Sequence, residues 1–363
     1  MLEAKRLNKA VVPKTLIPYP SPANLQSTRL AVHIAMEDSS VGRGKESLLI
    51  PETTQVLDSS LVNRCPHRSE IQSIVLAETE SKDCSILGSV DSYGHLIVSP
   101  LDASDRDVDG STYSVSPRDY GVGEGSWAGL CFNPSQLSMA AVARSFCKSI
   151  DIYDQDIHLR TLRTCFKIRI TAFGYSSLLV YHDDQAHYGL TSGRACLELW
   201  HPSSLVFMDN FSEGGNSMLA ITEGSQLSIW DLRVKENGGC VRGITGSVGD
   251  ILYAINISSS GNIAAGGADR TVTIYDPRRW SAISRWLHCS KYEITGLTFS
   301  SVDPNYIYVQ GVDYEVLCGQ WRESEKAFSF RGDSNWFGFS KCANRDILAG
   351  WCDSGSIFVA DVS

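Results

Sequence analysis

Three short stretches hold residue types that could bind a metal ion or a phosphate. Residues 105–110, DRDVDG, space their aspartates like the opening of a calcium-binding loop, but Ser116 stands where that loop needs a bidentate glutamate. Residues 182–187, HDDQAH, group two histidines with two aspartates, and no third ligand is evident. Residues 121–125, GVGEG, lack the Lys and the Ser/Thr of a phosphate-binding loop. We therefore expect no metal site and no cofactor.

Nucleophilic catalysis has no sequence signature in this chain. Neither a G-x-S-x-G elbow nor an H-E-x-x-H pair occurs, and the 8 histidines are scattered. No residues assemble a nucleophile with its base. The sequence therefore predicts no catalytic residues and a protein that is not an enzyme.

Arginine and tryptophan gather in residues 277–286, PRRWSAISRW. These two residue types are frequent among the interface residues that dominate binding energy. One interpretation is a partner-binding surface, and the other is that the two tryptophans pack between repeated units of the fold. The first interpretation predicts partner contacts by Arg279, Trp280, Arg285 and Trp286.

The composition limits the compartment and the partners. The chain has 363 residues, of which 43% are hydrophobic, and a formal net charge of −9. An acidic surface repels phosphate backbones, so we expect nucleic acid to be bound at most indirectly. The 11 cysteines form no C-x-x-C pair, and neither an N-terminal signal nor an apolar run of about 18 residues occurs. We expect a protein of the nucleus, the cytoplasm or both, without membrane contact.

The elements that would position these residues form a repeat. The clearest copy, residues 251–278, has an apolar strand, a Ser-Gly-Asn turn, a second strand, and a tight turn at Asp269 into the strand VTIYD. Most neighbouring copies lie roughly 40–47 residues apart, and the whole set predicts an all-β fold. The weaker copies are residues 71–98, 127–154, 170–201, 216–233, 294–321 and 335–361.

The repeats resemble those of WD-repeat β-propellers over about residues 65–363. The resemblance depends mainly on four strand endings, which are Trp230-Asp231, Tyr275-Asp276, Tyr153-Asp154 and Trp200-His201. It implies a seven-bladed propeller, in which stacked blades bury one another's faces. The family's Gly-His pair before the first strand of a blade is absent. That departure implies that the buried hydrogen-bonded network on this histidine is missing.

A propeller must close its ring, and the last repeat ends at what reads as its third strand. We predict two units, an N-terminal extension at residues 1–64 and the propeller at residues 65–363. The fourth strand of the last blade would come from the extension, either from RLAVHIAM at residues 29–36 or from ESLLIP at residues 46–51. The alternative is that residues 1–60 form a separate appendage or are partly disordered.

Two strand endings also resemble a sixteen-residue box that ends in Trp-Asp-x-Arg. In the propeller family this box marks proteins that dock on the damaged-DNA-binding adaptor of cullin-4 RING ubiquitin ligases. One copy spans residues 218–233, and the second spans residues 263–278 with a tyrosine in place of the tryptophan. A guanidinium at the end of each box can pair bidentately with a carboxylate of the adaptor. The adaptor-binding residues that the resemblance implies are Trp230, Asp231, Arg233, Tyr275, Asp276 and Arg278.

The expected function is a non-catalytic scaffold for protein–protein interaction. The boxes imply a substrate receptor of a cullin-4 RING ubiquitin ligase, with the adaptor on one surface and the substrate on another. The alternative is a structural subunit of a stable multiprotein complex in RNA processing, chromatin or trafficking, without a ligase role. In either case we expect a monomer within a complex.

Overall fold

The described part of the chain is built from β-strands, as the repeat pattern predicted. The computed structural model describes residues 26–28, 52–56, 67, 69–79, 84–102, 112–133, 136–163, 168–174, 177–182, 185–188, 195–198, 202–208, 218–231, 233, 239–246, 251–313, 315–332 and 334–362. Within these ranges the strands form six four-stranded antiparallel sheets, which resemble propeller blades, and one five-stranded sheet. A search of the same residues finds no helix long and apolar enough to cross a membrane.

The first four sheets are numbered by their place in the chain. Sheet 1 contains β3 (Ile71–Glu78), β4 (Cys84–Asp91), β5 (Leu96–Asp102) and β6 (Tyr113–Val115). Sheet 2 contains β7 (Ala128–Asn133), β8 (Gln136–Arg144), β9 (Ser149–Asp154) and β10 (Ile157–Arg163). Sheet 3 contains β11 (Ile168–Gly174), β12 (Ser177–His182), β13 (Gln185–Tyr188) and β14 (Ala195–Glu198). Sheet 4 contains β15 (Pro202–Phe207), β16 (Met218–Glu223), β17 (Gln226–Asp231) and β18 (Cys240–Thr245).

The last three sheets continue the same order of strands. Sheet 5 contains β19 (Leu252–Ile257), β20 (Ile263–Gly267), β21 (Val272–Asp276) and β22 (Ser281–Trp286). Sheet 6 contains β23 (Ile294–Phe299), β24 (Tyr306–Gly311), β25 (Glu315–Gln320) and β26 (Glu325–Arg331). Sheet 7 contains β27 (Trp336–Lys341), β28 (Ile347–Cys352) and β29 (Ile357–Asp361), followed by β2 (Glu52–Val56) and β1 (Gln26–Thr28).

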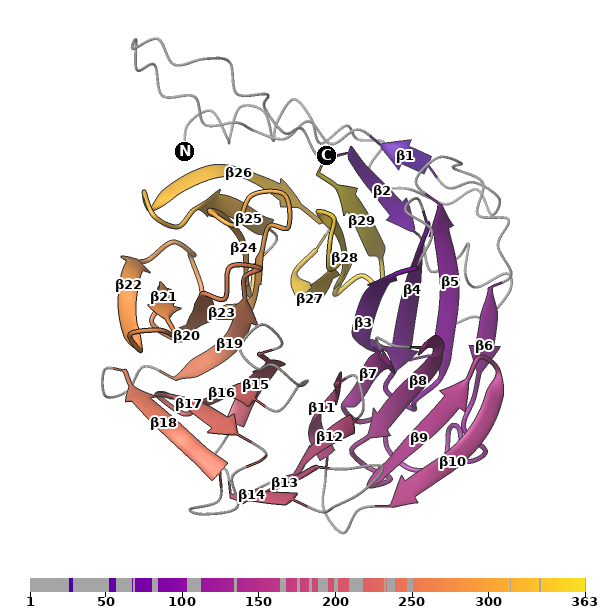
Figure 1. Ribbon diagram of the computed structural model, residues 1–363. Helices are drawn as coiled ribbons and strands as arrows, with labels where there is room; N and C mark the ends of the chain where they lie inside the picture. The colour runs from indigo at the N-terminus through magenta and orange to yellow at the C-terminus, as the bar shows by residue number, and fades with distance from the viewer. Residues whose placement is uncertain are drawn as a thin grey trace.

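The sheets are arranged around a central axis, with the first strand of each nearest the middle and the fourth nearest the rim (Figure 1). The first strands of neighbouring sheets contact one another in sequence from β3 to β27, and β27 also contacts β3. Because strands alternate in direction within each sheet, the turns after the first and third strands lie at one end of that sheet. We call this end of the sheets the third-strand end.

The hydrophobic core lies between neighbouring sheets rather than at one centre. One cluster joins Ala264 and Ile274 of sheet 5 to Ile307 of sheet 6, and another joins Leu76 of sheet 1 to Ala349 of sheet 7. A four-stranded sheet with two apolar faces needs such neighbours, because it cannot bury either face alone.

Small residues allow the sheets to approach closely. All five residues of β20, IAAGG, are buried. A Cβ atom placed on Gly267 would lie 1.9 Å from the carbonyl oxygen of Ile251, a distance that no side chain can occupy. Gly267 of β20 is thus required by the close packing of this strand against the chain before β19.

A register shift recurs where the third strand pairs with the fourth. It falls between Ile229 and Trp230 in sheet 4, between Ile274 and Tyr275 in sheet 5, and between Cys318 and Gly319 in sheet 6. Such a bulge increases the local twist and re-aims the residues beside it. The same irregularity therefore precedes the third-strand end in three successive sheets.

The N-terminal part of the chain supplies a strand to sheet 7. In β2, Thr54 is opposite Val359 of β29, and the two strands are antiparallel. The source of this strand agrees with the prediction, but its position is residues 52–56 rather than either predicted segment. Residues 29–36 and 46–51 lie outside the described residues.

Sheet 3 departs from the predicted repeat. Its third strand is β13, and the strand that precedes Trp200-His201 is β14, the fourth. That ending was therefore wrongly aligned with the third-strand endings of the other repeats. The pattern failed because β12 and β13 are joined by a very short hairpin, in which His182 pairs with Gln185. Residues 199–201 themselves lie outside the described residues.

Candidate protein-docking surface

The Trp-Asp-x-Arg ending of sheet 4 begins on a buried strand. In β17 the side chains of Leu227 and Ile229 are fully buried, and Trp230 is buried beside them. The indole Nε1 of Trp230 donates a hydrogen bond of 2.8 Å to Oγ of Ser228. A satisfied indole of this kind fixes the strand end against the core.

Arg233 follows this strand end and is held by Asp231. Its backbone amide donates to Oδ1 of Asp231 at 2.9 Å, its Nε donates to the same oxygen at 3.0 Å, and one terminal nitrogen donates to Oδ2 at 2.8 Å. The hydrogen bond from Arg233 holds the pKa of the Asp231 carboxyl below its usual value. The Arg233 side chain is nevertheless 60% exposed. Asp231 thus orients a guanidinium that remains open to solvent.

The third strand of sheet 5 ends in the same way, except that the side chain of its arginine is not bonded to the preceding aspartate. Tyr275 is buried, and Oδ1 of Asp276 accepts the backbone amide of Arg278 at 2.9 Å. Arg278 is exposed, and its guanidinium has no hydrogen-bond or ion-pair partner among the described residues. Arg233 and Arg278 therefore occupy equivalent positions, but only the guanidinium of Arg233 is held by the aspartate before it.

The second predicted group, at residues 279–286, is divided between core and surface. Trp286 is buried in the cluster shared by sheets 5 and 6, as the packing interpretation predicted. Trp280 is half-buried against the cluster shared by sheets 4 and 5. Arg279 is exposed, and Arg285 pairs with Asp269 at 3.8 Å. The group therefore does not form one contiguous exposed site.

Sheet 6 holds an arginine that the sequence interpretation missed. Arg322 follows β25 and lies with its guanidinium 4.5 Å from the ring centroid of Trp321. Its Nε donates to Oδ1 of Asn305 at 3.0 Å. No Trp-Asp pair marks this place, because Gly319 and Gln320 stand in those positions. Counting from the end of each third strand, rather than searching for the motif, would have found it.

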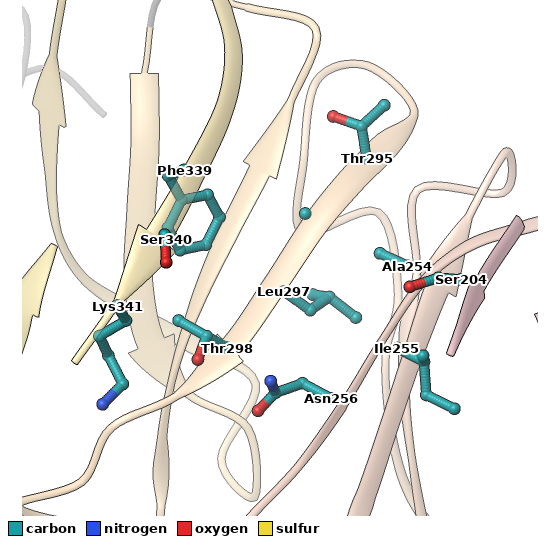
Figure 2. Close-up of a pocket in the computed structure, with 11 residues that line it drawn as sticks. Ser204, Ala254, Ile255, Asn256, Thr295, Leu297, Thr298, Phe339, Ser340 and Lys341 are labelled. Atoms are coloured by element: carbon teal, nitrogen blue, oxygen red, sulfur yellow. The ribbon is translucent and has the colours of Figure 1, made fainter. Parts of the chain in front are cut away.

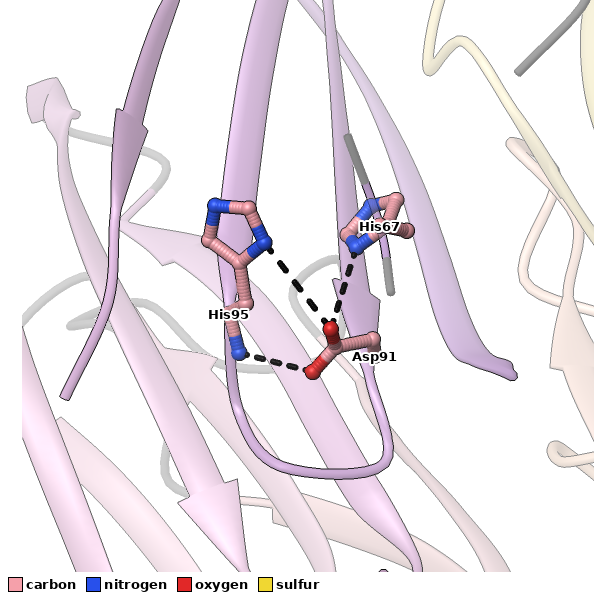
Figure 3. Close-up of side chains that lie close together, drawn as sticks. All are labelled: His67, Asp91 and His95. Carbon is pink, nitrogen blue, oxygen red and sulfur yellow. Dashed lines mark hydrogen bonds and ion pairs between the residues drawn. The ribbon is translucent and has the colours of Figure 1, made fainter. Parts of the chain in front are cut away.

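A buried histidine network in sheet 1 corrects another expectation. His67 Nε2 lies 2.8 Å from Oγ of Ser89, and His67 Nδ1 lies 3.5 Å from Oδ2 of Asp91. Figure 3 shows both His67 and His95 beside the Asp91 carboxylate. The expectation that no such network exists is therefore wrong for this sheet. The signal was missed because Pro66, not glycine, precedes the histidine.

The same three residues also have the composition of a metal site. Their ligand atoms lie within 4.8 Å of one another, and all three residues are buried. However, Oδ1 of Asp91 already accepts the amides of Tyr93 at 3.0 Å and His95 at 2.9 Å, and Oδ2 accepts the hydroxyl of Tyr120 at 3.1 Å. A cation would have to compete with these protein donors. We therefore assign the cluster to the fold, where it ties the chain before β3 to the turn after β4.

Burial alone would raise the pKa of the Asp91 carboxyl. The nearby His67 ring and the hydrogen bond from the His95 amide outweigh burial, so the pKa of Asp91 lies below its usual value. Asp91 is therefore an anion at neutral pH, and its charge is balanced by the donors that surround it.

A cavity of about 280 Å³ opens between the first strands of sheets 4 to 7 (Figure 2). Among the described residues that line it, only Lys341 is titratable. The Lys341 amine donates to Oγ of Ser301, to the carbonyl of Cys342 at 2.5 Å and to that of Arg345 at 3.2 Å, and it lies 3.5 Å from Asp346. Burial lowers the pKa of Lys341. Since its donors are all engaged by the protein, Lys341 stabilises the cavity wall.

The three stretches that were considered for metal or phosphate binding lie in different parts of the chain, and the structure describes two of them at least in part. His182 ends β12 and His187 lies in β13, opposite Val180, so the two histidines lie on neighbouring antiparallel strands. Residues 121–125 form an exposed loop. Residues 105–110 lie outside the described residues.

No protein-family model matches the chain, and no curated protein sequence matches it.

Proposed function

We propose that this protein is a WD-repeat-like seven-bladed propeller that acts as a non-catalytic scaffold for protein–protein interaction. The contact of β27 with β3, the core cluster shared by sheets 7 and 1, and the pairing of β2 with β29 support a closed ring. A closed ring leaves loops at its two ends as the surfaces on which partners can dock.

The observation that carries the proposal is the exposed, oriented guanidinium of Arg233. Asp231 holds it by two side-chain hydrogen bonds at the end of a strand whose Trp230 is buried. Arg278 stands in the same place one sheet later. A planar guanidinium held in this way is suited to a carboxylate of another protein.

The specific role that we propose is that of a substrate receptor in a cullin-4 RING ubiquitin ligase. In this role the third-strand end binds the damaged-DNA-binding adaptor through Arg233 and Arg278. The substrate would occupy another surface. The rival role is a structural subunit of a multiprotein complex that has no ligase connection.

The test is binding of the purified adaptor to the full chain and to the double variant Arg233→Ala/Arg278→Ala. We expect the unchanged protein to bind and the double variant to lose at least about tenfold in affinity, because exposed arginines at an interface centre often contribute more than about 1 kcal/mol each. Arg242→Ala, an exposed arginine on the rim strand β18, is the matched control and should bind normally.

Two outcomes would contradict this role. Undiminished binding by the double variant would show that the arginines of the two boxes do not contact the adaptor. Absence of adaptor binding by the unchanged protein, together with constant co-purification of other subunits, would favour the structural-subunit role.

A further inference from the structure

We propose that Arg322 is the third member of one docking row, formed by Arg233, Arg278 and Arg322, that fits an acidic surface of a partner protein. The inference rests on the proposed function, since it extends the same surface from two sheets to three. Neither Arg322 nor sheet 6 carries the Trp-Asp ending through which the other two were found.

The first support is the register. The third strands of sheets 4, 5 and 6 end at Asp231, Asp276 and Gln320. In each case the second residue after the strand is an arginine. Sheet 2 gives the contrast, because its third strand ends at Asp154 and the second residue after it is Asp156. The row is therefore confined, within the compared sheets, to three successive ones.

The second support is that contacts between sheets bring these loops together. Trp280, in the loop that follows Arg278, packs against the cluster shared by sheets 4 and 5. On the other side, Oγ of Ser284 in β22 donates a 2.8 Å hydrogen bond to the carbonyl of Trp321. Sheet 5 thus contacts the sheet that carries Arg233 and also the loop that carries Arg322. The three arginines therefore follow the third strands of three sheets that contact one another in sequence.

The third support is that Arg322, like Arg233, is oriented before any partner arrives. Trp321 is fully buried, and its Nε1 donates to the carbonyl of Pro304 at 2.8 Å. This anchored ring holds the Arg322 guanidinium by a cation–π contact, and Asn305 accepts its Nε. An exposed arginine that is already ordered loses less conformational entropy on binding than a free one.

These features define the chemistry of the partner. Guanidinium groups spaced along an edge favour carboxylates, which they can bind with two parallel hydrogen bonds. The net charge of −9 opposes a long, uniformly charged polyphosphate backbone more than a protein surface that carries a local group of carboxylates. We therefore assign the row to a protein surface rich in Asp and Glu.

The experiment measures affinity of the full chain for the purified adaptor with Arg322→Ala, Arg322→Glu and Arg322→Lys. We expect the alanine variant to bind about tenfold more weakly and the glutamate variant more weakly still, because it would repel an acidic surface. The lysine variant keeps the charge but loses the planar fork, so its affinity should fall between the unchanged protein and the alanine variant.

Arg270→Glu is the matched control, because Arg270 is exposed in the turn between β20 and β21, at the other end of sheet 5. Its affinity should equal that of the unchanged protein, and all variants should show the same thermal unfolding. Unchanged binding by Arg322→Glu would show that Arg322 is not part of the docking row, and it would leave the proposed function in place. If the unchanged protein does not bind the adaptor, both the row and the proposed function fail.

Discussion

At the scale of single residues, Asp231 contributes more to the orientation of Arg233 than to the stability of the fold. The Arg233 side chain is 60% exposed, and water screens the attraction between exposed charges, so this ion pair adds little to the stability of the fold. The two side-chain hydrogen bonds from Arg233 to Asp231 restrict the rotamers of a long side chain, whose ordering would otherwise oppose binding. The contact between Asp231 and Arg233 therefore contributes mainly to the affinity for a partner and not to the stability of the fold.

Glu223 is a residue whose ionisation opposes the fold. It ends β16, and its Oε1 has no hydrogen-bond partner among the described residues. Burial raises the pKa of Glu223 from 4.5 to about 7, against a weaker effect of Ser228. Because the folded state binds this proton more tightly than the unfolded chain, stability falls as pH rises from 4.5 towards 7.

We predict that Glu223→Gln stabilises the protein by about 1–2 kcal/mol at pH values above 7, since glutamine has no charge to bury. The free energy of unfolding in urea, measured at several pH values, checks this. The advantage of the variant should shrink as the pH falls towards 4.5, where the glutamate is neutral in the folded state. If the variant is more stable by the same amount at every pH, the ionisation of Glu223 is not the cause of the difference.

At the scale of the elements, Gly319 and Trp286 explain why the third strand of sheet 6 lacks the aromatic residue found near the end of the third strands of sheets 4 and 5. Gly319 stands where β17 has Trp230 and β21 has Tyr275. A Cβ atom on Gly319 would lie 2.3 Å from the indole of Trp286, which comes from β22 of sheet 5. The aromatic group at this level of sheet 6 is thus supplied by the sheet before it.

We predict that Gly319→Ala destabilises the fold by about 1–3 kcal/mol, because the new methyl group overlaps both the Trp286 ring and the carbonyl oxygen of Glu325, each at 2.3 Å. Urea unfolding provides the measurement. Gly266→Ala is the control, because its methyl group would meet only side-chain atoms of Ile294 and Leu297, at 3.1 Å or more. Equal losses in the two variants would contradict this account.

These elements also show how far the sequence could predict the structure. Strand periodicity and turn residues were sufficient for the all-β repeats and for the place of Arg233, because both depend on neighbours along the chain. The orientation of Arg322 could not be predicted in this way, because its Nε donates to Asn305, which lies 17 residues earlier in the chain. The His67 network joins residues 22 positions apart, and no local pattern contains that contact.

At the scale of the whole molecule, the strand β2 covers the edge of the last sheet. Without it, the backbone groups of β29 that face β2 would be left unpaired. An exposed edge strand can pair with another chain, so the cover protects against aggregation as well as adding hydrogen bonds. The strand that pairs with β29 is formed by residues 52–56.

We predict that removal of residues 1–56 lowers the thermal unfolding temperature by about 5 °C or more and promotes association, because β29 loses its neighbour. Removal of residues 1–25, which leaves β1 and β2 intact, is the control and should change the temperature little. Differential scanning calorimetry and light scattering are the measurements. Identical behaviour of the two truncations would mean that β2 does not support sheet 7.

The pairing of β2 with β29 also has a consequence for biosynthesis. The two strands are about 300 residues apart in the chain, so a ribosome adding about 5–20 residues per second makes the second of them roughly 15–60 s after the first. During that interval β2 exists without its partner, while the intervening sheets can already fold. Completion of sheet 7 therefore waits until β29 has been synthesised, and during this delay β2 is an unpaired strand that a chaperone could protect.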